Sequence, residues 1–134
     1  MTYRETLSQI YGLARFGIKP GLERVSRLLS ALGNPQLSIK SVSIAGTNGK
    51  GSTAAFLSSI LSSAGYRVGL FTSPHLICFT ERIQINGAEI SEEDVTRLAD
   101  KLMVVAPPQT TFFEIVTAMA LQYFHEQRVD LAVM

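Results

Sequence analysis

The 134-residue sequence contains no tryptophan, a single cysteine and almost no net charge. One cysteine excludes an internal disulfide, and we interpret Cys78 as a small buried apolar side chain rather than a nucleophile. The formal net charge of +1 gives no reason to expect binding to nucleic acid or to a membrane surface. Neither a membrane-spanning apolar run nor an apolar signal core is present, so we expect a cytoplasmic protein.

The residues that are present favour a folded chain, since 46% are hydrophobic and 17% are charged. Apolar spacing and capping signals predict helices that follow Thr2, Gly21, the glycine-rich stretch near residue 50, Ser91 and Thr111. The helix after the glycine-rich stretch is expected to bury a stripe formed by Phe56, Leu57, Ile60, Leu61 and Ala64. Short β-prone runs predict strands at 42–45, 66–71 and 130–134, and Asn86-Gly87 predicts a hairpin.

Strands that alternate with helices predict an α/β fold, with a mainly parallel sheet flanked by helices and one small hairpin. In such sheets ligands bind beyond the carboxyl ends of the strands. The segments GTNGKGS and TSPH both follow predicted strands, so we expect them at that edge. The last predicted strand, at 130–134, is expected to form an unpaired apolar edge.

Residues 44–53, IAGTNGKGST, concentrate glycines, hydroxyl groups and one lysine between a predicted strand and a predicted helix. Glycines allow backbone N–H groups to face an anion, and the start of a helix adds free N–H groups and a positive dipole end. Lys50 would reach phosphate oxygens, and Ser52 or Thr53 would offer a hydroxyl to Mg²⁺ or phosphate. Gly51 interrupts the usual G-x-x-x-x-G-K-[ST] spacing, and the alternative is a plain turn with a solvated Lys50.

Four motifs in order, GTNGKGS, GLFTSPHL, ERIQING and TFFE, resemble the folylpolyglutamate and dihydrofolate synthases of the Mur ligase superfamily. The stretch GLERVSRLLSALGNPQ is also similar to the amino-terminal segment of that family. The resemblance covers nearly the whole chain. It implies a phosphate-loop, Rossmann-like fold and an ATP-dependent ligase. In that reaction a carboxylate of dihydropteroate or a folate becomes an acyl phosphate, which the amine of L-glutamate attacks.

The resemblance implies ATP and Mg²⁺ as cofactors, with a monovalent cation as a further candidate. The implied partners are small molecules, namely dihydropteroate or folate, L-glutamate and ATP, and the parent protein is expected to be monomeric. Residues 1–134 are then the amino-terminal part of an incomplete ATP-binding domain, without the carboxy-terminal glutamate-binding domain. We therefore expect the chain to be inactive by itself. Two alternatives stay open: a phosphate-loop kinase or NTPase of another family, and a non-catalytic nucleotide-binding fragment.

The resemblance also implies roles for individual residues. Lys50 is the implied catalytic residue, and Ser52 and Ser73 are the implied metal ligands. Ser73 has the alternative of simple turn chemistry, since Ser-Pro initiates turns unaided. The residues implied to bind ATP through the glycine-rich loop are Gly46, Thr47, Asn48, Gly49, Lys50, Gly51, Ser52 and Thr53.

Three further residues have two interpretations each. The resemblance places Glu114 near the nucleotide and metal, whereas the spacing in TFFE predicts a capping box that uses Glu114 to begin a helix. Phe113 is implied to lie near the pterin ring, and the alternative is an ordinary core side chain. Arg82 is implied to meet a phosphate or a folate carboxylate, and the alternative is a solvated charge at the hairpin.

Overall fold

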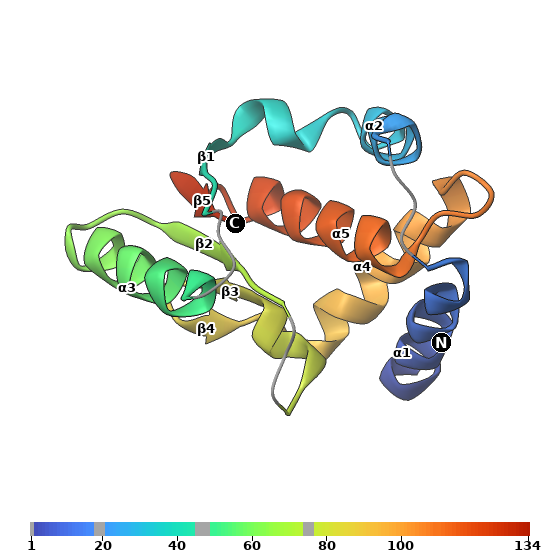
Figure 1. The fold of residues 1–134 in the computed structure, drawn as a ribbon, viewed down its shortest axis with the longest axis horizontal. Helices are drawn as coiled ribbons and strands as arrows, with labels where there is room; N and C mark the ends of the chain where they lie inside the picture. Colours follow the sequence, from blue (N-terminus) through green and yellow to red (C-terminus); the bar gives the residue numbers. More distant parts are fainter. Residues whose placement is uncertain (1, 18–20, 45–48, 74–76) are drawn as a thin grey trace. The chain divides into compact units, whose positions relative to one another are not determined.

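The computed structural model describes residues 2–17, 21–44, 49–73 and 77–134 (Figure 1). The chain divides into two compact units. We call them the helical unit, residues 1–36 with 92–123, and the sheet unit, residues 37–91 with 124–134. Across the described ranges, every helix is too short or too polar to cross a membrane.

The helical unit contains four of the five helices predicted from apolar spacing and capping signals. They are α1 (Tyr3–Gly12), α2 (Glu23–Ala31), α4 (Glu92–Val105) and most of α5 (Phe112–Glu126). The short 3₁₀ helix η1 (Leu13–Phe16) was not predicted. Both α1 and α2 pack against α4. The apolar faces meet in a core whose fully buried members include Ile10, Leu28, Val95, Leu98, Leu102, Ile115 and Met119.

A capping box fixes the start of α1, as predicted. The backbone N–H of Glu5 donates to the Thr2 hydroxyl at 3.1 Å, and the Thr2 N–H donates to the Glu5 carboxylate at 3.3 Å. These bonds satisfy two backbone donors that a helix start otherwise leaves without a partner. The local sequence signal was therefore sufficient to place this helix.

The sheet unit holds five strands in the order β1-β5-β2-β3-β4. Strands β1, β5 and β2 pair in parallel, whereas β2, β3 and β4 pair antiparallel. This mixed, mainly parallel core with helices beside it confirms the predicted fold class. The strands are β1 (Lys40–Val42), β2 (Val68–Phe71), β3 (Ile83–Ile85), β4 (Ala88–Glu89) and β5 (Leu131–Val133), with the 3₁₀ helices η2 (Pro35–Ser38) and η3 (Phe79–Arg82).

Two strand predictions need correction. The last strand, β5, is not an unpaired edge, because it pairs with β1 on one side and with β2 on the other. The first strand spans Lys40–Val42 rather than 42–45, and Ala45 lies outside the described residues. The predicted hairpin is confirmed, since Asn86 and Gly87 join β3 to β4 with φ angles of 48° and 82°.

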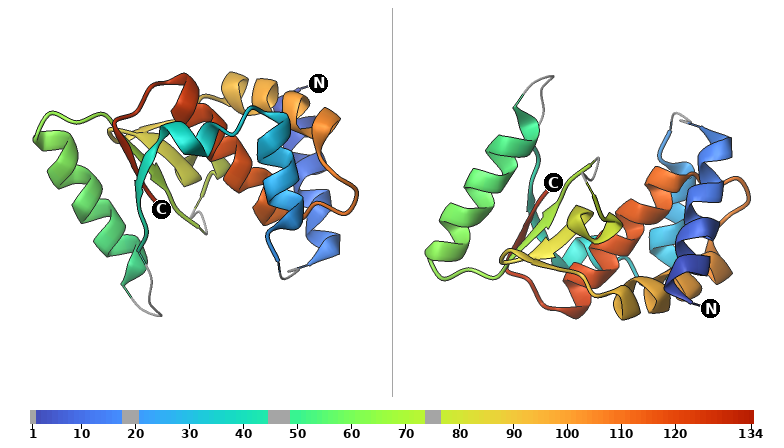
Figure 2. Two further views of the ribbon diagram at one scale, coloured as in Figure 1. Left: turned by 90° about the horizontal axis from the view of Figure 1, so that it is seen from above. Right: turned by 90° about the horizontal axis from the view of Figure 1, so that it is seen from below.

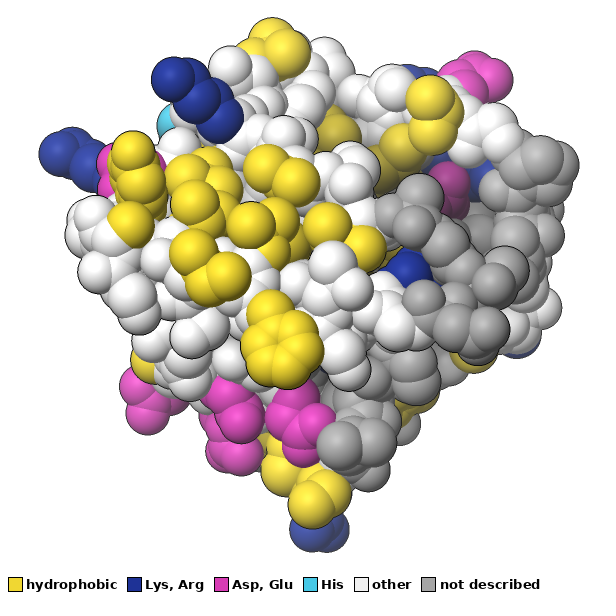
Figure 3. Space-filling model, turned by 60° about the vertical axis from the view of Figure 1, so that its left-hand side comes forward, with side chains coloured by type: hydrophobic (Ala, Val, Ile, Leu, Met, Phe, Trp, Pro, Cys, Tyr) yellow, Lys and Arg dark blue, Asp and Glu magenta, His cyan; other side chains and the backbone are white. Residues whose placement is uncertain are grey.

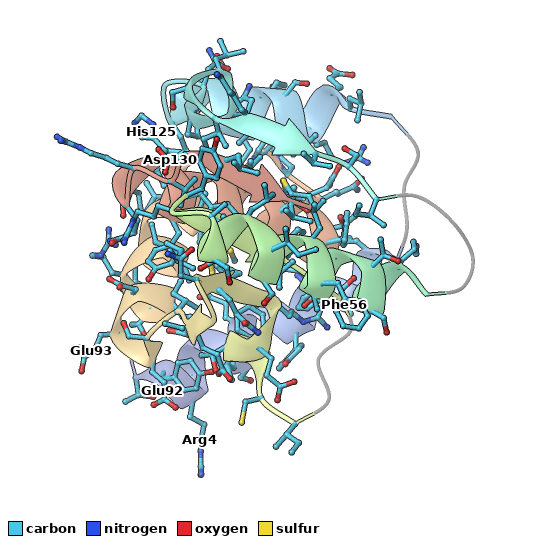
Figure 4. The ribbon with its side chains drawn as sticks, turned by 90° about the vertical axis from the view of Figure 1, so that its left-hand side faces the viewer. Arg4, Phe56, Glu92, Glu93, His125 and Asp130 are labelled. Carbon is cyan, nitrogen blue, oxygen red and sulfur yellow. The ribbon has the colours of Figure 1, made fainter. Side chains whose placement is uncertain are left out.

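Helix α3 (Lys50–Ser63) contacts β2 and β5, and it runs along one face of the sheet (Figure 2). Only part of the predicted stripe is covered, because Phe56 and Ile60 are 69% and 66% exposed. Figure 4, in which α3 faces the viewer, labels Phe56 at the helix surface. Apolar side chains are also visible in Figure 3, which turns this side of the molecule forward. Leu57 and Leu61 of the predicted stripe do pack beneath α3, where they join Ala54, Val68, Leu70 and Val133.

Cys78 is exposed, so the prediction of a buried side chain is wrong. It directly precedes η3, where the Glu81 carboxylate accepts hydrogen bonds from the N–H groups of Ile77 and Cys78 at 3.0 and 2.7 Å. The backbone of Cys78 is therefore used to begin a helix. A helix cap needs no burial of the capping residue's side chain.

Gly69, in the middle of β2, lies against the ring of Phe124. A Cβ atom at this position would be 2.7–2.9 Å from three ring carbons, and Phe124 is fully buried. Such separations are shorter than van der Waals contact, so the sheet unit needs glycine here for packing and not for its backbone angles.

We predict that Gly69→Ala lowers the free energy of unfolding by about 1–3 kcal/mol, because the buried Phe124 ring must shift. Urea denaturation of the 134-residue chain measures the change. Gly12→Ala is the matched control: its new Cβ meets nothing nearer than an Arg15 guanidinium nitrogen at 3.6 Å. That control should leave stability unchanged or slightly raised. If Gly69→Ala is as stable as the wild type, the packing argument is wrong. Adding Phe124→Leu to Gly69→Ala should restore part of the lost stability, because the smaller side chain leaves room for the new Cβ.

Candidate functional site

Of the glycine-rich stretch that leads into α3, the structure describes the residues from Gly49 onward. Gly46, Thr47 and Asn48, three of the predicted phosphate-binding residues, lie outside the described residues. Gly49 is the N-cap of α3 with a φ of 74°, a left-handed conformation that favours glycine. The backbone N–H of Thr53 donates to the Gly49 carbonyl at 2.9 Å, which begins the helical hydrogen-bond ladder.

The first turn of α3 is open to solvent and has the properties of an anion site. Lys50, Gly51, Ser52 and Thr53 are all exposed. No side chain caps this helix start, and its first turn carries no acidic residue. The first N–H groups of a helix have no partner within the helix, and the positive end of the helix dipole lies there, so this end favours negative charge. A phosphate would therefore meet backbone donors and the Lys50 ammonium together.

Parallel pairing brings the predicted loops to one edge of the sheet unit. Beyond the strands, the Met134 N–H donates to the Val42 carbonyl and the Ile44 N–H donates to the Met134 carbonyl, both at 3.0 Å. The pairing of β1 and β5 thus continues toward the glycine-rich stretch. Ser73 follows β2 and is exposed, so it extends from the same edge.

Arg82 is buried, with only 8% of its surface exposed. The alternative of a solvated hairpin charge is therefore wrong. Its carbonyl accepts a hydrogen bond from the N–H of Thr72 at 2.9 Å, which ties the end of η3 to the residue that precedes Ser73. Its predicted contact with a phosphate or carboxylate stays a prediction.

Glu114 in the helical unit has the capping role that its sequence pattern predicted. The Thr111 N–H donates to the Glu114 carboxylate at 2.9 Å, and the Glu114 N–H donates to the Thr111 hydroxyl at 3.3 Å. The same carboxylate oxygen accepts a bond from Arg24 Nε at 3.1 Å. Sequence reasoning missed Arg24, because 90 positions separate it from its partner.

The ionisation of Glu114 reflects these contacts. Burial by itself would raise the pKa of the carboxyl group. Hydrogen bonds from the Thr111 N–H, Arg24 and the Thr111 hydroxyl, with the Arg24 charge, outweigh burial and lower the pKa below its ordinary value of 4.5. Glu114 is consequently a carboxylate near neutral pH, although its side chain is only 10% exposed.

A largely apolar cavity of about 640 Å³ lies next to this ion pair, within the range typical of small-molecule sites. Phe113, 56% exposed, is part of its wall, so the interpretation of Phe113 as a core residue is wrong. The neighbouring Phe112 stacks instead on Tyr11, with ring centroids 5.4 Å apart. The lining residues are Gly17, Gly21, Leu22, Val25, Thr111, Phe113, Glu114 and Thr117.

The metal ligands stay predictions. Within the part of the chain that the structure describes, no three His, Cys, Asp or Glu side chains gather in a way that would hold a metal ion. Ser52 and Ser73 are both exposed. Each would supply one hydroxyl oxygen, a donor type that suits Mg²⁺ together with phosphate oxygens and water.

A mainly parallel sheet whose first strand leads through a glycine-rich stretch into a helix defines an α/β protein of the phosphate-loop class. The sequence is 47% identical to a dihydrofolate synthase/folylpolyglutamate synthase of Bacillus subtilis over 139 residues. That match covers 98% of this chain and 32% of the relative. No model of a protein family matches the chain.

The similar solved structures include complexes with ligands. A folylpolyglutamate synthase in complex with AMPPCP and folate superposes on the chain with a TM-score of 0.89 and 32% identity, covering 100% of this chain and 35% of the other. The bifunctional folylpolyglutamate synthase/dihydrofolate synthase of Yersinia pestis, complexed with AMPPNP and a manganese ion, superposes with a TM-score of 0.87 and 35% identity. That match covers 99% of this chain and 33% of the other. Nearly the whole chain is therefore similar to part of these folylpolyglutamate and dihydrofolate synthases, and it spans about a third of the length of each of the three relatives.

We predict that Glu114 stabilises the chain above its ordinary pKa of 4.5 and loses this effect as the pH falls through its lower folded-state pKa. A lowered pKa means that the folded state favours the carboxylate, so protonation favours unfolding. Urea denaturation at a series of pH values below 4.5 should show that the wild type loses stability more steeply with falling pH than Glu114→Gln does. Glu5→Gln, which alters the exposed capping box of α1, is the control and should change the profile less. Parallel profiles for wild type and Glu114→Gln would contradict this assignment.

Proposed function

We propose that the chain is the amino-terminal, ATP-binding part of a ligase that joins L-glutamate to dihydropteroate or a folate. The observation that carries this proposal is the start of α3, where Gly49 and Lys50 lie at the carboxyl edge of the parallel strands. Its support is the match to named synthases along 98% of the chain. Relatives with the same fold are complexed with ATP analogues, folate and manganese.

In this proposal the α3 start binds the phosphates of ATP. Lys50 neutralises charge as the terminal phosphoryl group moves to the substrate carboxylate, and the backbone N–H groups orient the phosphate chain. Ser52 and Ser73 contribute oxygens to Mg²⁺, which neutralises further phosphate charge. The acyl phosphate has a good leaving group, so the glutamate amine can displace phosphate and form the amide bond. The reacting groups of the substrates must be held in the right orientation, so the protein contributes mainly by positioning them.

The cavity of the helical unit is proposed to hold the pterin part of the substrate. Its walls are mostly apolar, and the exposed Phe113 ring offers a face for stacking against a flat heterocycle. Glu114 is already engaged by Thr111 and Arg24, so its proposed role is to fix the start of α5 beside the cavity. A direct contact between Glu114 and the nucleotide is not needed for this role.

The relatives are about three times as long as this chain, and we propose that the glutamate site belongs to the remaining part. By itself the 134-residue chain should therefore bind ATP weakly and form no glutamate adduct. Phosphate release that requires both glutamate and a pteroate would support a ligase. Release that is independent of glutamate would instead indicate a phosphate-loop NTPase of another kind.

We predict that Lys50→Ala in the full-length ligase lowers turnover by at least 100-fold, because developing phosphoryl charge loses its cation. The measurement is product formation with ATP, glutamate and a pteroate, together with a melting curve. Lys40→Ala removes an exposed lysine from β1 of the same unit and should keep wild-type activity. Activity of Lys50→Ala within tenfold of wild type, with an unchanged melting temperature, would refute the assignment.

We predict that Ser73→Ala raises the Mg²⁺ concentration needed for half-maximal activity and leaves the melting temperature nearly unchanged. The reason is that Ser73 is exposed at the edge of the sheet and contributes little packing. Activity is titrated with Mg²⁺ at saturating ATP. If the mutant has the same Mg²⁺ requirement and turnover as wild type, Ser73 is only a turn residue.

A further inference from the structure

Glu81 holds the backbone that follows the segment of Ser73. One oxygen of its carboxylate, Oε2, accepts hydrogen bonds from the N–H groups of Ile77 and Cys78 at 3.0 and 2.7 Å. Both residues are exposed, Ile77 to 84%, so packing does little to fix this stretch. Hydrogen bonds to a carboxylate are shorter and stronger than those to a neutral oxygen. Glu81 therefore supplies a fixed point where burial supplies little.

The backbone on the other side of Ser73 is held by the next residue of η3. The Arg82 carbonyl accepts a hydrogen bond from the N–H of Thr72 at 2.9 Å, which extends the antiparallel pairing of β2 and β3 beyond the strands. Thr72 directly precedes Ser73. Two consecutive residues, Glu81 and Arg82, thus bond the chain before and after Ser73.

The short helix η3 can act as a support because it is bound to the hairpin. The Thr80 hydroxyl donates to the Glu89 carboxylate of β4, and the side-chain amide of Gln84 in β3 donates to the Glu81 carbonyl at 2.9 Å. Phe79 and Thr80 are also buried. A ligand is held precisely only when the groups around it are themselves fixed. Through η3, the β3–β4 hairpin provides such a base beside the Ser73 segment.

We propose that Glu81 is a positioning residue for the metal site, because its carboxylate holds the chain after Ser73 and so keeps the Ser73 hydroxyl in place for Mg²⁺. This inference rests on the proposed function, which makes Ser73 a metal ligand. Losing a contact that orients a metal ligand typically weakens metal binding by about 10–100-fold. The alternative is that Glu81 only caps η3, which predicts lower stability with unchanged metal binding.

Three substitutions separate the reach of Glu81 from its charge. Glu81→Ala removes the acceptor. Glu81→Gln keeps an acceptor oxygen at the same reach and loses the charge, whereas Glu81→Asp keeps the charge and withdraws the acceptor by one methylene. Glu5→Ala is the matched control. The Glu5 carboxylate also accepts a backbone N–H in a capping box, that of Thr2 at 3.3 Å, but it begins α1 in the helical unit.

The test measures Mn²⁺ binding to the full-length protein saturated with AMPPNP, by electron paramagnetic resonance, together with melting curves. Glu81→Ala should weaken Mn²⁺ binding by about tenfold. Glu81→Asp should weaken it by about threefold or more, and it decides the question if Glu81→Ala does not fold. Glu81→Gln and Glu5→Ala should stay within about twofold of wild type. Equal weakening by Glu81→Gln and Glu81→Ala would overturn the proposal, because charge and not position would then be the cause.

Ser73→Ala shows whether Glu81 acts through Ser73. Alone, Ser73→Ala should weaken Mn²⁺ binding by about tenfold. Adding Glu81→Ala should weaken binding by less than about a further twofold, because the residue to be positioned is gone. If the two effects multiply, or if Glu81→Ala and Glu81→Asp both bind Mn²⁺ as wild type does, the proposal is wrong.

The same variants test the proposed function separately. If Ser73→Ala weakens Mn²⁺ binding and the Glu81 variants do not, the metal role of Ser73 stands and the role of Glu81 fails. If Ser73→Ala binds Mn²⁺ as wild type does, the metal role of Ser73 fails and the role of Glu81 fails with it. In that case a glutamate adduct formed by the wild type still supports the ligase.

Discussion

The parallel pairing of β5 with both β1 and β2 is the interaction on which the sheet unit depends. It joins the strand before the glycine-rich stretch to the strand before Ser73. Lys40 of β1 and Val68 of β2 both pair with Leu131 of β5, although 28 positions separate them in the sequence. Parallel strands cannot pair through a short turn, so α3 must form the crossover between β1 and β2. The same crossover places the first turn of α3, with Gly49 and Lys50, at the carboxyl edge.

A single carboxylate has the corresponding role in the helical unit. Glu114 receives the Thr111 N–H at the start of α5 and the Arg24 guanidinium from α2. A partly buried charge needs such partners, since its desolvation is otherwise unfavourable. The contacts that offset the desolvation of the Glu114 carboxylate also hold α2 against the start of α5. The wall of the cavity is therefore set by electrostatics as well as by apolar packing.

Local signals in the sequence predicted most elements correctly. Thr2 with Glu5, Asn86-Gly87 and Thr111 with Glu114 each specify a structure within four residues, so no distant contact is needed to interpret them. Predictions that depend on distant contacts were poorer. The central position of β5 and the Arg24–Glu114 pair involve partners far apart in the chain, and no periodicity reveals which strand or helix will be the neighbour.

The site residues divide in the same way. Lys50 was predicted from a local glycine-rich pattern and Ser73 from the family resemblance of the TSPH segment, whereas Arg24 belongs to no such pattern. Burial was misjudged for Phe56, which is apolar and yet exposed. An apolar stripe shows that a helix has a side suited to packing, but which residues of that side are covered depends on the neighbouring strands.

Phe113 and Thr117 depart from ordinary packing in opposite directions. An aromatic ring is 56% exposed, and a hydroxyl four residues later is buried without a partner. Either departure alone is common in folded proteins. Both residues line one cavity, but the Thr117 oxygen is shielded from solvent, so only the Phe113 ring is placed to meet a ligand there. An exposed aromatic ring in an apolar wall is expected at a binding site, because stability there is given up for recognition.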